Sequence, residues 1–402
     1  MKQITKISLT SLFFLIIYFY LFYSGLIKYL ALGSSYYFGD YKIFVNALNC
    51  IDKGLSPYVG PKEYNCYGFN YGHLILILTP FKNFFINSNP YFIPIIFSFL
   101  FIVVTIIILN TKNLLQFFLA SLAILNPATL LLIERMNLDI LLYFIIIILA
   151  FNKISFLNWL LIIYSFLFKF HPFVYGIIIF VEKKKRNLIN LLLIFIFMLF
   201  FSLFLIFLYR EEYTLIFSNT GGWKMGLHYL FSIKTIPKIL KESFSIHYGL
   251  SILIINVFFI WFVFKKSIKL EGSLQDDYLF KKKLFLLSSN SLLFCFLTFS
   301  NALYREVFLI LTIPYIFLHA NSNIFKNILY ILYLKFIFNF IYTLDLNFET
   351  FYHVNGVRYY MNHFLIISFF KGAIDFILML FLGVITLKMN LDIWNSLKKR
   401  NI

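Results

Sequence analysis

The sequence predicts an all-α polytopic membrane protein, a helical bundle of about twelve transmembrane helices with polar loops on its outer face. The chain of 402 residues is 61% hydrophobic and only 13% charged, whereas a soluble fold needs far more polar surface. Runs of about 20 apolar residues, the length that crosses hydrocarbon as a helix, recur along the whole chain. Lys and Arg gather in the short segments between these runs, as they do in the cytoplasmic loops of membrane proteins.

The apolar runs define the predicted spans in order. They lie near 7–31, 91–110, 114–133, 138–152, 155–169, 172–181, 188–209, 249–266, 284–303, 306–320, 324–344 and 363–388. The first run is too long for a signal peptide and lacks a small-residue cleavage site, so we interpret it as a retained anchor. The three short runs between 138 and 181 could also be drawn as two spans. The segment 71–85 is apolar but short and contains Pro80, which favours a re-entrant or interfacial element over one more span.

The basic residues orient these spans. With an even number of spans, both termini lie in the cytoplasm together with the run from Lys183 to Arg186. Cytoplasmic loops and contact with anionic membrane lipids then explain the formal net charge of +18, and no nucleic-acid partner is expected. Four segments remain outside, namely 33–90, 134–137, 210–248 and 345–362. We therefore expect a single integral domain over 1–402 in a bacterial-type inner or plasma membrane.

The outer loop 33–90 holds the carboxylate of Asp40 directly after the first span. An ionisable group beside hydrocarbon is costly, so such a residue is a functional-site candidate. The loop also contains Cys50 and Cys66. In an oxidising compartment they could form a disulfide, but independent free thiols explain them equally well. Cys295 lies in an apolar run and is most simply a small core residue.

A second polar group lies between two predicted spans. Glu134, Arg135, Asn137 and Asp139 fall within six residues, which is dense for a turn between membrane helices. An ordinary capped turn would explain Asn137 and Asp139 near a helix N-terminus. Glu134 and Arg135 are less easily explained in this way, so the four residues are candidates for substrate or phosphate binding.

Lys169 and His171 follow the next predicted span without any hydrophilic loop around them. In the expected topology Lys169 lies on the outer side, against the usual distribution of cations, and there it needs an anionic partner such as a lipid phosphate. Snorkelling of the lysine to lipid headgroups is the alternative.

The remaining outer segments contribute weaker candidates. Trp223 and His228 lie among glycines in loop 210–248, which suits a surface that receives a sugar but equally any interfacial loop. Arg305 and Arg358 are further candidate phosphate ligands. Lys371 and Asp375 are four residues apart in the last run and are expected to form a structural intrahelical ion pair.

Several classes of protein lack support in the sequence. There is no Walker loop, no strand-to-helix GxGxxG motif, no HExxH motif and no Cys/His spacing for zinc. We therefore expect no metal and no separate cofactor. The polar residues instead suit a reaction on a lipid-borne anion at the outer face.

The order of these motifs resembles a known family. The first outer loop contains Phe38-Gly39-Asp40-Tyr41, then Asn46-Ala47-Leu48 and Gly54-Leu55-Ser56-Pro57-Tyr58. It is followed by Tyr71-Gly72-His73 with Pro80, by Asn126-Pro127, by Asn137-Leu138-Asp139 and by Lys169-Phe170-His171-Pro172. This series resembles the membrane glycosyltransferases of the GT-C class, especially the family 87 (DUF2029) polyprenol-phosphate-mannose-dependent mannosyltransferases. Met136 stands where the family pattern has a glycine. The resemblance covers residues 1–181, whereas 182–402 resemble the family only in topology.

The resemblance implies an inverting glycosyltransferase with a GT-C-like helical bundle. Such an enzyme would transfer a hexose, most simply mannose, from a polyprenyl-phosphate donor to a glycan or glycolipid acceptor at the outer, periplasmic face. Asp40 would be the general base. Lys169, with Arg135, Arg305 or Arg358, would bind the donor phosphate. His171, Glu134, Asn137, Asp139, Trp223 and His228 would contact the substrates.

Two other classes of membrane protein remain as alternatives. A polysaccharide polymerase or a flippase for lipid-linked oligosaccharides would also have about twelve spans, but a polymerase should carry a large arginine-rich loop in its second half. A secondary transporter should show paired broken helices in two related halves, and the sequence has no such repeat.

Overall fold

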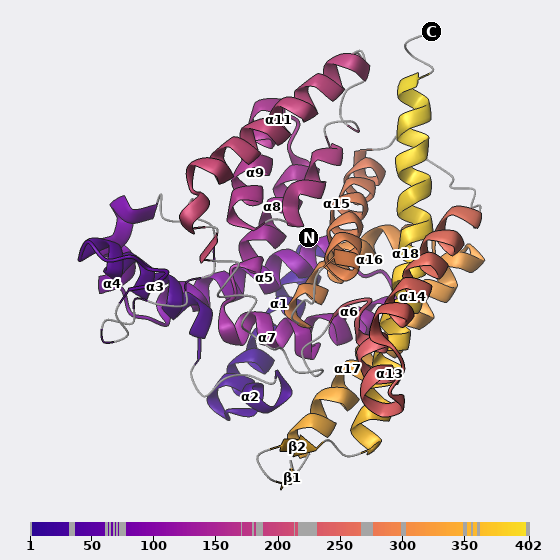
Figure 1. Cartoon of the computed structure of the whole chain (residues 1–402), viewed down its shortest axis with the longest axis horizontal. Helices are drawn as coiled ribbons and strands as arrows, with labels where there is room; N and C mark the ends of the chain where they lie inside the picture. The colour runs from indigo at the N-terminus through magenta and orange to yellow at the C-terminus, as the bar shows by residue number, and fades with distance from the viewer. Residues whose placement is uncertain are drawn as a thin grey trace. The chain divides into compact units, whose positions relative to one another are not determined.

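The computed structural model describes most of the chain as helix (Figure 1). The described residues are 2–31, 37–60, 63, 66, 69, 71, 78–169, 171–178, 181, 188–212, 214–215, 231–266, 276–298, 303–348, 352–354, 357–359 and 362–398. Two three-residue strands, β1 (Tyr352–Val354) and β2 (Val357–Tyr359), form a small antiparallel hairpin. The prediction of a helical protein is confirmed, with this hairpin as its one addition among the described residues.

Each predicted span contains a helix, but the count of twelve transmembrane helices is not confirmed. In the described part of the chain, 5 helices are long and apolar enough to cross a membrane, or up to 6 if one bent pair counts as a single span. Several others are too short to cross on their own, such as the 13-residue helix over Asp139–Phe151. At the predicted span 172–181 the chain forms a 3-10 helix, η3 (His171–Ile177). Of the segment 71–85, residues 72–77 lie outside the described residues.

The chain divides into two compact units that interleave in sequence. Unit 1 contains Met1–Ser35, Phe101–Glu134 and Met225–Leu391, and unit 2 contains Tyr36–Leu100, Arg135–Lys224 and Asp392–Ile402. Each unit therefore draws on both sides of residue 181. One helix, α5 (Phe92–Leu109), begins in unit 2 and ends in unit 1.

Unit 1 is built from the following elements. They are α1 (Lys2–Tyr23), α2 (Leu26–Leu30), α6 (Leu114–Ile124), most of α7 (Pro127–Arg135), α13 (Thr235–Phe244), α14 (Tyr248–Lys265), α15 (Asp276–Thr298), η5 (Leu303–Val307), α16 (Phe308–Leu318), α17 (Asn323–Phe348), the hairpin and most of α18 (Asn362–Lys398). Its core is α16, in which every residue from Phe308 to Ile316 is buried. This helix packs closely along α15. A helix that is apolar on all sides and surrounded by others is typical of the centre of a membrane bundle.

Unit 2 contains α3 (Gly39–Asp52), α4 (Lys82–Asn87), α8 (Asp139–Phe151), α9 (Ser155–Phe168), η3 and α11 (Leu188–Leu208). The helices α8, α9 and α11 lie side by side, and α3 packs against α4 (Figure 1). Cys50, at the end of α3, is joined to Cys66 by a disulfide with 5.6 Å between the Cα atoms. Of the two possibilities for these cysteines, the structure has the disulfide.

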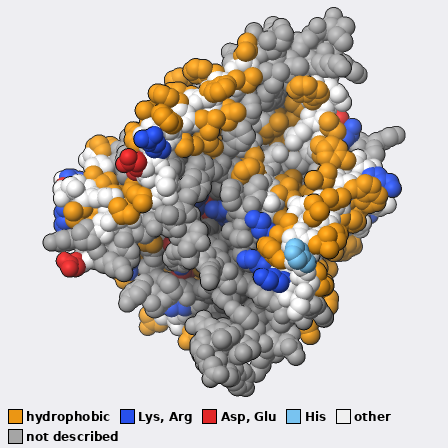
Figure 2. Space-filling model, in the orientation of Figure 1, with side chains coloured by type: hydrophobic (Ala, Val, Ile, Leu, Met, Phe, Trp, Pro, Cys, Tyr) orange, Lys and Arg blue, Asp and Glu red, His pale blue; other side chains and the backbone are white. Residues whose placement is uncertain are grey.

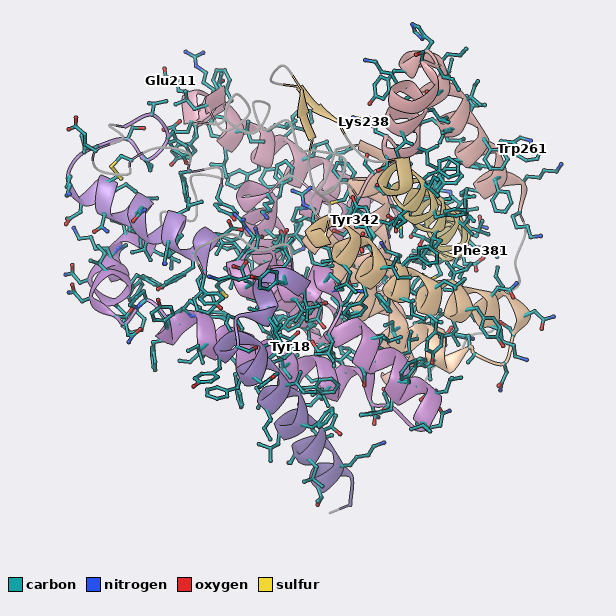
Figure 3. All side chains as sticks on the ribbon, turned by 90° about the horizontal axis from the view of Figure 1, so that it is seen from below. Tyr18, Glu211, Lys238, Trp261, Tyr342 and Phe381 are labelled. Carbon is teal, nitrogen blue, oxygen red and sulfur yellow. A yellow bond between two sulfur atoms is a disulfide. The ribbon has the colours of Figure 1, made fainter. Side chains whose placement is uncertain are left out.

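Both units carry helices with apolar outer surfaces. On α14 the exposed side chains include Leu253, Val257 and Phe264, and on α11 they include Phe197 and Phe204. Figure 2 shows hydrophobic side chains spread over both helices. Trp261 of α14, labelled in Figure 3, is exposed, with its ring beside Phe258 and Lys265 of the same helix. Exposed apolar bulk of this extent suits contact with lipid chains.

Candidate active site in unit 2

Helix α3 places a buried carboxylate at its first turn. Asp40 is the second residue of α3, where a negative charge is favoured by the unpaired N–H groups of the helix start. Its side chain is only 8% exposed. Tyr41, Phe44 and Leu48 form the buried face of the same helix, so the packing of that face fixes the position of Asp40. Burial raises the pKa of the Tyr41 phenol above its ordinary value.

The turn between α7 and α8 brings two donors to this carboxylate. Arg135 ends α7, and its Nη2 and Nε donate hydrogen bonds to Asp40 Oδ1 at 2.6 and 3.1 Å. Asn137 Nδ2 donates to the other oxygen, Oδ2, at 2.5 Å. Between the two lies Met136 in the left-handed conformation, with φ 48°. Residues on both sides of Met136, Arg135 and Asn137, therefore reach the same aspartate.

Lys169 completes the arrangement from the end of α9. It is the residue that follows the last turn of that helix, and its Nζ donates to Asp139 Oδ1 at 2.6 Å and to Asn137 Oδ1 at 3.3 Å. The Asp139 side chain is completely buried. Its backbone N–H also donates to Asn137 Oδ1 at 2.9 Å. The amide of Asn137 is therefore held on its oxygen side by Lys169 and Asp139 and on its nitrogen side by Asp40.

An aromatic group covers one side of these residues. The Lys169 ammonium lies 5.2 Å from the centre of the Tyr71 ring, a cation–π contact. The Tyr71 hydroxyl is 3.3 Å from Asn137 Nδ2. The ring of Phe69 packs against the rings of both Tyr71 and Tyr58. Tyr58 lies within the loop that the Cys50–Cys66 disulfide closes, and Phe69 and Tyr71 follow that loop.

The result is one connected set of polar side chains, which we call the Asp40 network. Its members are Asp40, Arg135, Asn137, Asp139 and Lys169. Two carboxylates and two cations balance one another, as buried charges must. Each carboxylate oxygen can accept more than one hydrogen bond, so Asp40 keeps the capacity to accept one from a substrate hydroxyl.

The described contacts of this network involve none of the other sequence candidates. Glu134 is fully buried but belongs to unit 1. Arg305 is also in unit 1, where its Nη1 lies 3.9 Å from Cys295 Sγ. Arg358 lies in β2 with its backbone opposite His353, and His171 begins η3, but the side chains of both are outside what is described. Trp223 and His228 lie outside the described residues altogether.

Unit 1 contains a second set of buried charges, which we call the buried charge cluster. Its members are Glu306, Lys335, Asn339, Lys371 and Asp375. The predicted pair of Lys371 and Asp375 is present at 2.8 Å. Sequence reasoning missed Lys335 and Asn339. They stand four residues apart in an apolar run, a spacing that places both on one helix face, and this was the signal that could have revealed them.

The described residues contain no group of three or more His, Cys, Asp or Glu side chains that could hold a metal ion. Comparison with protein-family models, with curated proteins and with solved structures gave no match. The fold and the site themselves define the class of protein: a helical chain with several apolar helices long enough to span a membrane, carrying a buried, charge-balanced network around Asp40.

Proposed function

We propose that the chain is an inverting membrane glycosyltransferase of the GT-C type, with Asp40 as its general base. Its donor would be a polyprenyl-phosphate hexose, most simply the mannose derivative, and its acceptor a glycan or glycolipid. The reaction would take place on the outer face of the membrane, with both termini in the cytoplasm.

One observation carries this proposal. Asp40, Arg135, Asn137, Asp139 and Lys169 come from three stretches of the sequence and were each candidates before their contacts were known. Their side chains nevertheless form one hydrogen-bonded network. A capped turn accounts for Asn137 and Asp139, but it gives no reason for Arg135 and Lys169 to join the same pair of carboxylates.

The chemistry that the network would support is a single displacement. The acceptor hydroxyl gives its proton to Asp40 while its oxygen forms a bond to the anomeric carbon. The bond between that carbon and the phosphate oxygen breaks on the opposite face, and its electron pair leaves with the polyprenyl phosphate. Configuration at the anomeric carbon is therefore inverted. Positive charge beside the departing phosphate stabilises it, and this step requires no metal ion.

Asn137 has a positioning role in this proposal. Its Nδ2 holds Asp40 Oδ2 at 2.5 Å, and its own orientation is fixed because Oδ1 accepts from Lys169 and from the Asp139 N–H. A general base acts well only when it is held at hydrogen-bond distance from the proton it takes. Lys169 thus acts on the base through Asn137.

The test is the substitution Asp40→Asn, which keeps the shape of the side chain but removes its basicity. Purified protein in lipid nanodiscs would be supplied with polyprenyl-phosphate mannose carrying a radiolabelled sugar and with a membrane extract as the source of acceptors. We expect released polyprenyl phosphate and labelled product from the wild type. In the variant both should fall by about a hundredfold to ten-thousandfold, the range that general-base catalysis contributes, while the protein still inserts and binds the donor.

Asp52→Asn is the matched control, because Asp52 lies on the same helix but is 48% exposed and pairs with Lys82. It should leave turnover unchanged. Turnover retained in Asp40→Asn would refute the assignment of the base. A wild-type protein that moves the intact donor across the bilayer without releasing polyprenyl phosphate would instead be a flippase.

A further inference from the structure

The two cations of the Asp40 network are held in different ways. Lys169 is 11% exposed and bonds to the fully buried Asp139, to Asn137 and to the face of Tyr71. Withdrawing Lys169 would leave a carboxylate buried without its counter-ion, which is among the most destabilising changes in a protein interior. Lys169 is therefore committed to its present partners.

Arg135 is the more accessible of the two cations, with 25% of its side chain exposed. Its Nε and Nη2, which form one edge of the guanidinium, both donate to the single oxygen Oδ1 of Asp40. The strongest arrangement for such an edge is a parallel pair of hydrogen bonds to two oxygens of one anion. In this structure only one oxygen of Asp40 meets that edge, while the second oxygen faces Asn137. A phosphate group, with several equivalent oxygens, does offer the paired arrangement.

The geometry points to Arg135 as a latch on the base: its guanidinium exchanges the Asp40 carboxylate for the phosphate of the donor, so that donor binding frees Asp40 Oδ1 to receive the acceptor hydroxyl. This inference rests on the proposed function and deepens it, since it separates the roles of the two cations. Arg135 binds phosphate, whereas Lys169 positions the base through Asn137. Throughout the exchange Asp40 Oδ2 remains bonded to Asn137, so the base stays in place.

The latch makes a prediction that a fixed phosphate site does not make. In the wild type, Asp40 competes with the phosphate for Arg135 and also repels it. Asp40→Asn removes the repulsion and weakens the competition, because a neutral amide oxygen binds a guanidinium less strongly than a carboxylate does. This inactive variant should therefore bind a lipid phosphate roughly three- to tenfold more tightly than the wild type. Arg135→Gln should bind it at least about tenfold more weakly. Lys169→Gln should lower turnover but leave the affinity for the phosphate within about a factor of three.

The experiment measures binding of undecaprenyl phosphate to the full-length protein in nanodiscs made of neutral lipid. Undecaprenol measures binding of the polyprenyl chain without the phosphate. Phosphatidylglycerol measures binding of an ordinary anionic headgroup, and inorganic phosphate measures binding of the free ion. Arg210→Gln is the matched control for loss of one positive charge, because Arg210 is an exposed residue of unit 2 that contacts Phe207. Gel filtration and circular dichroism identify any variant that fails to fold, and Arg135→Lys, which keeps the charge but not the planar edge, then replaces Arg135→Gln.

The outcomes separate the latch from the proposed function. If the wild type binds undecaprenyl phosphate no better than undecaprenol, or no better than phosphatidylglycerol, the proposed function fails. If it binds the lipid phosphate selectively but Asp40→Asn binds no more tightly, the latch is wrong and the function stands. Equal affinity in Arg135→Gln and the wild type likewise overturns the latch. Tighter binding in Asp40→Asn together with weaker binding in Arg135→Gln supports it.

Discussion

The substitution Lys335→Met in unit 1 tests how buried charges stabilise this protein. Lys335 is completely buried, and its Nζ lies 2.7 Å from Glu306 Oε1, 2.5 Å from Asp375 Oδ1 and 2.8 Å from Asn339 Oδ1. The contacts with Glu306 and Asn339 are hydrogen bonds, and the contact with Asp375 is an ion pair. Methionine has a similar length but no charge, so it removes the contacts without leaving a large cavity.

The expected loss in the free energy of unfolding follows from the charges that remain in the variant. In the wild type two lysines face two carboxylates, whereas in the variant Lys371 alone faces both Glu306, at 3.2 Å, and Asp375, at 2.8 Å. Removing one partner of a buried pair costs about 3–5 kcal/mol, chiefly because a charge is left uncompensated. We therefore expect the free energy of unfolding to fall by about 4 kcal/mol.

A second substitution distinguishes charge balance from loss of contacts. Glu306→Gln alone leaves one excess positive charge and should also cost about 3–5 kcal/mol. The double variant restores neutrality around the pair of Lys371 and Asp375, and the glutamine can still accept from Asn339 Nδ2, which lies 2.7 Å from Glu306 Oε2. It should cost only about 2 kcal/mol, the value of the hydrogen bonds that are lost. The double variant should therefore be more stable than either single variant.

Unfolding in mixed micelles by added sodium dodecyl sulfate, followed by the fluorescence of the 4 tryptophans, measures these differences. Lys281→Met is the control, because Lys281 pairs at 2.6 Å with an aspartate that is 68% exposed, and such a surface pair contributes at most about 1 kcal/mol. If the two single costs simply add in the double variant, the balance of charge does not hold the cluster together and the reasoning is wrong.

Two further predictions concern backbone positions in unit 2. Met136 is buried and has a left-handed backbone conformation with φ 48°. Met136→Gly and Met136→Ala both lose the packing of the side chain, but only the glycine variant also loses the backbone strain. Chemical denaturation should find the glycine variant more stable by about 1 kcal/mol, and the opposite order would contradict the strain. A Cβ added at Gly60 would lie 2.5 Å from both Cys66 Cβ and Ser56 O, so Gly60→Ala should destabilise unit 2 by about 1–3 kcal/mol. Gly54→Ala is the control, because an added Cβ there has no atom within 4 Å, although the residue has φ +69°. It should cost only the conformational strain, about 1 kcal/mol. Equal losses of stability at Gly54 and Gly60 would argue against the clash at Gly60.

The helices could be predicted because their signal is local. A long apolar run such as the one that becomes α5 needs no tertiary information to be recognised as a possible span. The number of spans was less secure, because short helices such as α8 and η3 have lengths that depend on their neighbours. The break before Pro127 illustrates this difficulty. The sequence suggests one span over 114–133, but the chain forms two helices bent by 44°.

The site was predictable in its members but not in its pairing. Asp40, Arg135 and Lys169 were each unusual for their surroundings, and that is a property of the sequence. The contact between Arg135 and Asp40 joins residues 95 positions apart, and the periodicity of helices or strands cannot predict a contact over that separation. The pair of Lys371 and Asp375 was predictable because four residues span one helical turn. Its link to Lys335 was not, because that link depends on how α17 and α18 pack.

The disulfide between Cys50 and Cys66 provides a way to determine on which side of the membrane α3 lies. Thiol pairs persist in oxidised form only outside the reducing cytosol, and Cys295 is buried. Denaturation exposes the free thiol of Cys295, so protein from intact cells should take up one maleimide polymer before reduction and two more after it if Cys50 and Cys66 are oxidised. That result would assign α3 to the oxidising side. Asp40 lies in the first turn of α3 and Cys50 near its end, so the same gel would also establish to which side of the membrane the helix that carries Asp40 belongs.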